Sequence, residues 1–121
     1  MNVSVYFNPA CSTCRTVASI LEEHGVAIDY VRYLDQAPTR QDLEHVLELL
    51  GVDDPRQIVR AKEPVYDELG LDAADRDALL DAMVAHHILI QRPIVILGGR
   101  AVVARPAERV LELIVSPAAN A

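Results

Sequence analysis

The stretch Tyr6–Arg15, with the sequence Tyr-Phe-Asn-Pro-Ala-Cys-Ser-Thr-Cys-Arg, predicts how the rest of the chain is organised. It contains both cysteines of the 121-residue chain, Cys11 and Cys14, separated by two residues. Residues 3–7 before it are mostly β-branched or aromatic, which is typical of a strand, and a helical pattern follows it. A C-x-x-C at a strand–helix junction, with no other cysteine present, indicates redox chemistry rather than a disulfide framework.

The helix after this stretch is predicted by small and apolar residues that share one helical face, at Cys14, Val17, Ala18 and Leu21. Gly25 stands where a helix commonly ends. Residues 27–33 alternate again and predict a second strand, parallel to the first because a helix joins the two.

The segment 35–87 is predicted to be helical, starting at a capping box formed by Thr39 and Asp42. Residues 88–93 are predicted to be extended, and residues 94–97 and 100–103 to form a hairpin around Gly98 and Gly99. A last helix follows Pro106. This order predicts an α/β fold: a thioredoxin-like mixed sheet of about four strands, with a helical insertion at about 35–87 between the second and third strands. We expect one domain over residues 1–121, with a frayed tail at 116–121.

Composition limits the classes of function. The net charge of −7 argues against nucleic-acid binding, which requires a basic surface. We also expect no membrane span, because no run approaches the roughly 18 apolar residues that a span requires. The first residues show no export signal, so we expect a reducing, cytoplasmic location.

Cys11 is the predicted nucleophile. A cysteine at a helix N-terminus faces unpaired N–H groups and the positive end of the helix dipole, both of which favour the thiolate. Arg15, one turn further, could add positive charge. The same N–H groups favour a tetrahedral oxyanion, so an anion-binding loop is predicted at Asn8, Ser12, Thr13 and Arg15.

Cys14 has two interpretations that the sequence leaves open. It is either a resolving thiol that closes a disulfide with Cys11, or a small apolar residue on the buried face of the helix. We expect no metal site, because one C-x-x-C supplies two ligands and structural zinc takes four.

The cysteine loop resembles the active-site loop of the glutaredoxin-linked arsenate reductases, the thioredoxin-fold ArsC family. The resemblance extends along nearly the whole chain, through Tyr33-Leu34, Pro38–Arg40, Arg60–Tyr66, Leu69-Gly70, His87–Val95 and Arg105-Pro106. The Arg92–Val95 segment is also shared with the related Spx-type regulators.

This resemblance implies a thiol-dependent reduction of arsenate to arsenite, in which Cys11 attacks the arsenic. Arg60, Arg92 and Arg105 would hold the oxyanion, and Pro93 would be the cis-proline opposite the cysteine. Glutathione would act as co-substrate and glutaredoxin as electron donor, with no bound cofactor.

Two positions depart from the family pattern. Many of these reductases carry a histidine at the position of Phe7, and many have no cysteine at the position of Cys14. Two alternative functions therefore accompany the first: an Spx-like redox-sensing regulator that binds RNA polymerase, and a general thiol–disulfide oxidoreductase.

Overall fold

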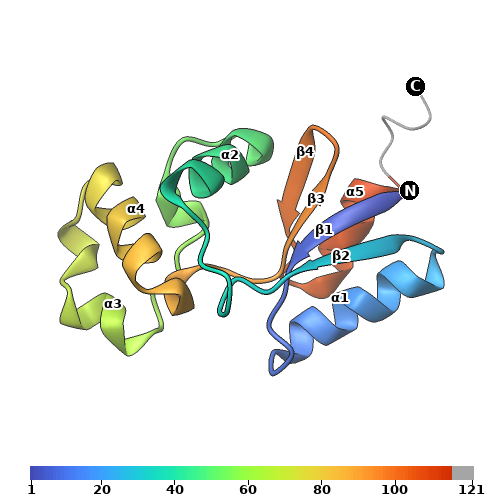
Figure 1. Cartoon of the computed structure of the whole chain (residues 1–121), viewed down its shortest axis with the longest axis horizontal. Coiled ribbons are helices and arrows are strands. Elements are labelled where there is room, and N and C mark those ends of the chain that lie inside the picture. Colours follow the sequence, from blue (N-terminus) through green and yellow to red (C-terminus); the bar gives the residue numbers. More distant parts are fainter. Residues whose placement is uncertain (116–121) are drawn as a thin grey trace. The chain divides into compact units, whose positions relative to one another are not determined.

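The chain forms two compact units, one of Met1–Arg32 with Arg92–Ala121 and the other of Tyr33–Gln91. The computed structural model describes residues 1–115 (Figure 1). The expectation of a frayed tail at 116–121 lies outside these residues. The two units are described one after the other.

The first unit is built on a four-stranded sheet in the order β2-β1-β3-β4. Its strands are β1 (Asn2–Tyr6), β2 (Ala27–Val31), β3 (Ile94–Leu97) and β4 (Arg100–Val103). β1 pairs in parallel with β2, while the β1–β3 and β3–β4 pairs are antiparallel. The predicted α/β class, the mixed thioredoxin-like sheet and the parallel first pair are confirmed.

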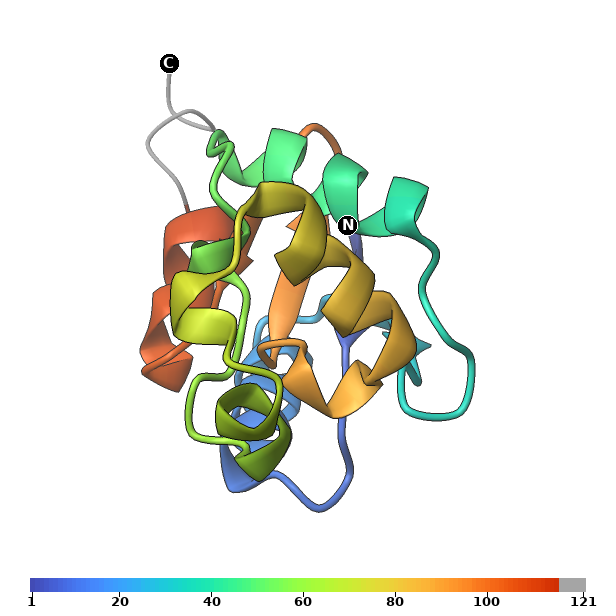
Figure 2. The ribbon, with the colours of Figure 1, turned by 90° about the vertical axis from the view of Figure 1, so that its left-hand side faces the viewer.

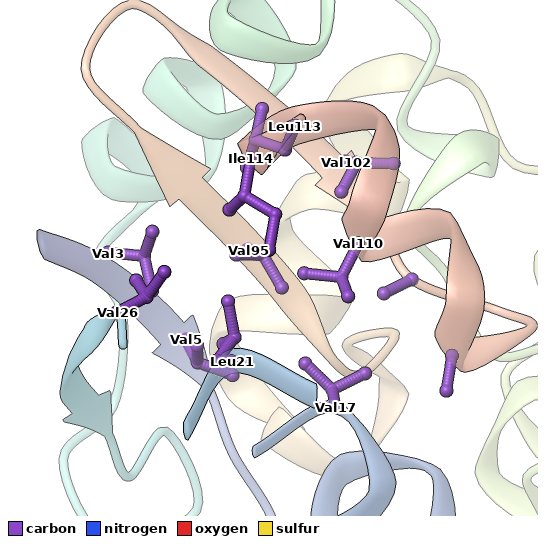
Figure 3. Close-up of a cluster of buried hydrophobic side chains, with 12 residues drawn as sticks. Val3, Val5, Val17, Leu21, Val26, Val95, Val102, Val110, Leu113 and Ile114 are labelled. Atoms are coloured by element: carbon purple, nitrogen blue, oxygen red, sulfur yellow. The ribbon is translucent and has the colours of Figure 1, made fainter. Parts of the chain in front are cut away.

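An apolar cluster lies between this sheet and the helices that pack on it. Helix α1 (Ser12–Glu23) contributes Val17 and Leu21, because residues four apart share a helical face. The 3₁₀ turn η4 (Ala107–Val110) and helix α5 (Leu111–Ile114) pack from the C-terminal end of the chain. Figure 3 shows their side chains against those of Val3, Val5 and Val95. This core fixes α1, and therefore the cysteine loop that precedes it, on the sheet.

The second unit contains the predicted helical insertion between β2 and β3. Its elements are α2 (Arg40–Leu50), η1 (Pro55–Gln57), α3 (Pro64–Glu68), η2 (Leu71–Ala73), α4 (Arg76–Ala85) and η3 (His87–Leu89). Thr39 and Asp42 form the predicted capping box at the start of α2. Helices α2 and α4 pack side by side (Figure 2).

The segment before Pro93 differs from its predicted extended conformation. His87–Leu89 form the 3₁₀ turn η3, in which the backbone N–H of Leu89 donates to the carbonyl of His86 at 3.0 Å. Ile90 is extended and forms an isolated antiparallel bridge to Val59, with backbone hydrogen bonds from Arg60 to Leu89 and from Gln91 to Ile58, both at 2.7 Å. The first part of the predicted extended segment is therefore wrong, because a short buried 3₁₀ turn and a short extended segment have similar sequences.

We predict that Leu21→Ala lowers the free energy of unfolding by about 2–5 kcal/mol, the usual cost of such a truncation in a closed core. Leu21 is fully buried in the cluster, whereas the neighbouring Ile20 is only partly buried against it. Ile20→Ala removes a side chain of similar size and should cost less than half as much. Urea unfolding followed by circular dichroism measures both values, and equal losses would contradict the described core.

Candidate active site

The loop between β1 and α1 is held by its own hydrogen bonds. The Oδ1 atom of Asn8 accepts the backbone N–H of Ala10 at 3.0 Å, which is the local turn that asparagine favours. The carbonyl of Asn8 accepts the N–H of Cys11 at 2.9 Å. The Nη1 atom of Arg15 reaches back to the carbonyl of Pro9 at 2.8 Å. These contacts place Cys11 directly before the first turn of α1.

Cys11 is the N-cap residue of α1, with extended backbone angles of φ −90° and ψ 119°. Its carbonyl accepts the N–H of Arg15 at 3.1 Å and thereby starts the helical hydrogen-bond pattern. The side chain is 9% exposed, so the sulfur is close to the surface but largely shielded from water. An N-cap side chain faces the free N–H groups of the first turn, where an anion is favoured.

The groups around Cys11 favour its thiolate. Burial by itself raises the pKa of Cys11, but it is outweighed by the backbone N–H of Cys14, a hydrogen bond from the Cys14 thiol, and the Arg92 guanidinium. Together they lower the pKa from 9.0 to about 7. The Cys11 side chain makes no capping hydrogen bond of regular geometry. The Cys14 N–H therefore lowers the pKa of Cys11 without a regular capping hydrogen bond, because a nearby N–H still stabilises the diffuse charge of the sulfur.

Cys14 behaves differently although it is only one helical turn away. Its side chain is fully buried. Burial is the main cause that raises its pKa to about 12, and the neighbouring Cys11 adds to this, although the backbone N–H of Asn8 and the charge of Arg92 act in the opposite direction. Cys14 thus combines features of both interpretations, since it packs on the buried helix face and its thiol also contacts Cys11. Both cysteines are free thiols.

Arg92 approaches Cys11 through pairing that is distant in sequence. β1 pairs with β3 so that Tyr6 lies opposite Ile94, which brings the residues before β3 next to the start of the cysteine loop. The Arg92–Pro93 peptide bond is cis. The Nη1 atom of Arg105 donates to the carbonyl of Arg92 at 3.0 Å, and its side chain is exposed. Two of the three predicted arginines therefore gather in the same unit as the cysteines.

Arg60, the third predicted arginine, belongs to the second unit. Its Nη1 atom donates to Oε1 of Gln91 at 3.0 Å, and its Nε atom lies 3.9 Å from Oε2 of Glu63. Gln91 directly precedes Arg92 in the chain. The role of Arg60 toward an oxyanion stays a prediction.

The remaining residues of the predicted anion loop have separate surroundings. The Arg15 guanidinium lies on the carbonyl of Pro9, and the cation that acts on Cys11 is Arg92. The role of Arg15 toward Cys11 stays a prediction, whereas Arg92 is among the main causes that lower the pKa of Cys11. Ser12 is exposed and its carbonyl accepts the Thr16 hydroxyl at 3.0 Å, while Thr13 is half-buried.

Phe7, at the position where a histidine is common, packs against another aromatic ring. Its ring centroid lies 4.8 Å from that of Tyr30, with an interplanar angle of 73°. This edge-to-face contact is a favoured aromatic arrangement. Phe7 thus stabilises the start of the loop by packing and contributes no charge to Cys11.

Within residues 1–115, no three His, Cys, Asp or Glu side chains gather as a metal-binding group would require. No helix in the same part of the chain is both long and apolar enough to cross a membrane.

Comparison with known proteins assigns the chain to a family. The model of the ArsC family matches residues 6–113, which include the cysteine loop, Arg92 and Arg105. The chain belongs to the ArsC family.

Several ArsC relatives are similar over most of their length. An arsenate reductase of Neisseria meningitidis serogroup A is 42% identical over 110 residues, covering 89% of this chain and 94% of the relative. An arsenate reductase of Haemophilus influenzae is 39% identical over 116 residues, covering 94% of this chain and all of the relative. The solved structure of an arsenate reductase from Vibrio cholerae matches with a TM-score of 0.89 at 40% identity, covering 93% of this chain and 97% of that one.

The sequence predicted that free N–H groups of the first turn act on Cys11, but not that the Cys14 thiol does. The Cys14 backbone N–H and thiol both lower the pKa of Cys11, and the N–H of Asn8 acts on Cys14. That the Cys14 N–H is the group involved could have been found from spacing alone, because the third residue after an N-cap carries the N–H that faces the cap side chain.

We predict that iodoacetamide alkylates Cys11 with a rate that rises through pH 7 and levels off above it, because only the thiolate reacts. Arg92→Gln removes a positive charge and a hydrogen bond from the sulfur and should raise the pKa of Cys11. A rise of about one unit would lower the thiolate fraction at pH 7 roughly fivefold. Mass spectrometry of the Cys11 peptide across pH gives both curves.

Arg15→Gln is the matched control, since it removes a guanidinium that follows Cys11 by one helical turn but lies on the Pro9 carbonyl. Its alkylation curve should stay close to that of the wild type. A control curve displaced as far as that of Arg92→Gln would show that the assignment of the acting cation is wrong.

Proposed function

We propose that this protein reduces arsenate to arsenite with thiols, using Cys11 as the nucleophile. The observation that carries the proposal is the lowered pKa of Cys11, about 7, beside the Arg92 guanidinium at the N-terminus of α1. The names of its ArsC relatives support arsenate as the substrate. The family model spans residues 6–113, a range that contains Cys11, Arg92 and Arg105.

In that step the Cys11 thiolate attacks the arsenic atom, and one arsenic oxygen leaves as water after taking up protons. The Arg92 guanidinium, which stabilises the thiolate, is also suited to an oxyanion bound next to it, because guanidinium groups bind oxyanions through paired N–H donors. Free N–H groups at the start of α1 favour the same charge. Arg105, which donates to the Arg92 carbonyl and is exposed, would bind a further arsenate oxygen.

A second thiol must then complete the reduction, since the change from As(V) to As(III) takes two electrons. The family resemblance implies that glutathione adds to the Cys11 adduct with loss of water. A glutaredoxin thiol would then attack the glutathione sulfur, so that the bond between this sulfur and arsenic breaks with its electron pair left on arsenic. Water would finally cleave the Cys11–As(III) bond, which releases arsenite and the Cys11 thiol. The proposed function itself requires only that a second thiol completes the reduction.

A second candidate function is general thiol–disulfide exchange, which the hydrogen bond between the Cys11 and Cys14 thiols favours. The two functions differ in their need for an oxyanion. Reduction of insulin disulfides by the pre-reduced protein, at the same rate with and without arsenate, would support the second candidate against the first.

We predict that Cys11→Ser reduces arsenate turnover to background, because a serine hydroxyl does not ionise near neutral pH. The assay couples NADPH oxidation through glutathione reductase, glutathione and glutaredoxin, with arsenite quantified directly. Wild-type protein that produces no arsenite with glutathione–glutaredoxin or with thioredoxin would refute the proposed function.

We predict that Arg92→Lys and Arg105→Lys each lower kcat/KM for arsenate by about 10–100-fold, as expected for loss of a hydrogen bond between charged groups worth roughly 1.5–3 kcal/mol. Arg60→Lys tests the role that the family resemblance assigns to it. Arg109→Lys is the control, because Arg109 forms an exposed pair with Glu112 and should tolerate the change. Losses of equal size in all four variants would indicate a general effect on folding rather than anion binding.

A further inference from the structure

We propose that Cys14 resolves the Cys11–arsenic adduct by forming an intramolecular Cys11–Cys14 disulfide, so that one reduced chain converts one arsenate without a thiol from outside. This inference rests on the proposed function and specifies its second thiol. It also specifies the external donor, which must then be a dithiol that reduces a protein disulfide.

The position of the two cysteines in α1 supports this role. Cys11 is the N-cap residue and Cys14 is the third residue of the helix, so their side chains lie one above the other on the same face. The Cys14 thiol is among the groups that lower the pKa of Cys11, which is consistent with side chains that lie next to each other. A disulfide needs Cβ atoms about 3.5–4.5 Å apart, somewhat closer than helical neighbours at roughly 5–6 Å. Cys11 has extended rather than helical backbone angles, and this non-helical residue can supply the remaining approach.

Burial favours the internal thiol over an external one. The Cys11 side chain is only 9% exposed, so a thiol from solution must reach a largely covered sulfur. The Cys14 thiol is one helical turn from that sulfur in the same helix. Groups held in a reactive geometry gain an effective concentration far above that of any dissolved thiol.

The coupling between the two thiols sets the order of the steps. Burial raises the pKa of Cys14 and so keeps its thiol protonated. Cys11 raises this pKa further, through its hydrogen bond and its charge. Once the Cys11 sulfur is bonded to arsenic, it no longer carries the thiolate charge. The backbone N–H of Asn8 and the charge of Arg92 still favour ionisation of Cys14. Loss of the Cys11 charge therefore removes one of the causes that keep Cys14 protonated, so Cys14 is a better nucleophile after Cys11 has reacted than before.

The resolving step is balanced without any further oxidant or reductant. The Cys14 sulfur attacks the Cys11 sulfur, an S–S bond forms, and the S–As bond breaks with its electron pair remaining on arsenic. Arsenic passes from As(V) to As(III), and the proton of the Cys14 thiol goes to an arsenic oxygen. Over both steps, one arsenate and two thiols give one arsenite, one water and one disulfide.

The test is a single turnover with the full-length protein, fully reduced and then freed of added thiol. With excess arsenate, the wild type should release one arsenite per chain and lose both free thiols. Peptide mass spectrometry should find Cys11 joined to Cys14 within a monomer. Cys14→Ser should release at least tenfold less arsenite under these conditions, and glutathione with glutaredoxin should restore its production.

Cys11→Ser is the matched control, because it also leaves one thiol and should release no arsenite with or without a donor. Circular dichroism and thermal unfolding establish that both variants are folded. A wild type that produces arsenite only when glutathione and glutaredoxin are added would overturn the resolving role while leaving the proposed function intact. Equal single-turnover release by the wild type and Cys14→Ser would overturn it too.

A wild type that produces no arsenite with any donor would remove the proposed function and this step with it. The pairing of the thiols is measured independently by equilibration with reduced and oxidised dithiothreitol. A monomer with a Cys11–Cys14 disulfide supports the proposed pairing. Chains joined to one another through Cys11, or two free thiols that remain in oxidised dithiothreitol, contradict it.

Discussion

The balance between burial and hydrogen bonding at the Cys11 sulfur is the interaction on which the site depends. A thiol that is largely removed from water is normally held neutral. Here a backbone N–H, a second thiol and a guanidinium together outweigh that effect. The sulfur is therefore both shielded and ionisable near neutral pH, which combines a reactive thiolate with limited access for competing reagents.

The fold maintains this balance through a small number of contacts. Asn8 closes the loop with its side chain and its carbonyl, and the core between α1 and the sheet holds the helix in place. The pairing of β1 with β3 brings Arg92, which is distant in sequence, to the cysteine loop. Local turn chemistry thus sets the position of the sulfur, and long-range strand pairing supplies its counter-charge.

The two cysteines illustrate how one spacing produces two different chemical environments. Cys11 caps the helix and faces its free N–H groups, whereas Cys14 is inside the helix on the face that packs into the protein. Burial raises both pKa values, and the interaction between the two thiols lowers the pKa of Cys11 and raises that of Cys14. Phe7, which cannot carry charge, is compatible with this arrangement because Arg92 and the helix terminus already favour the thiolate.

The sequence by itself determined the strand–helix–strand start, the helical insertion, the hairpin and the position of Cys11 directly before a helix, because each follows from spacing within a few neighbouring residues. The same local reasoning predicted an extended segment from residue 88, where residues 87–89 instead form a 3₁₀ turn. Only the tertiary structure decided that Arg92 acts on Cys11 and that the Cys14 side chain is buried. Those features depend on which strands pair and on what covers a side chain, and no spacing along the chain encodes either.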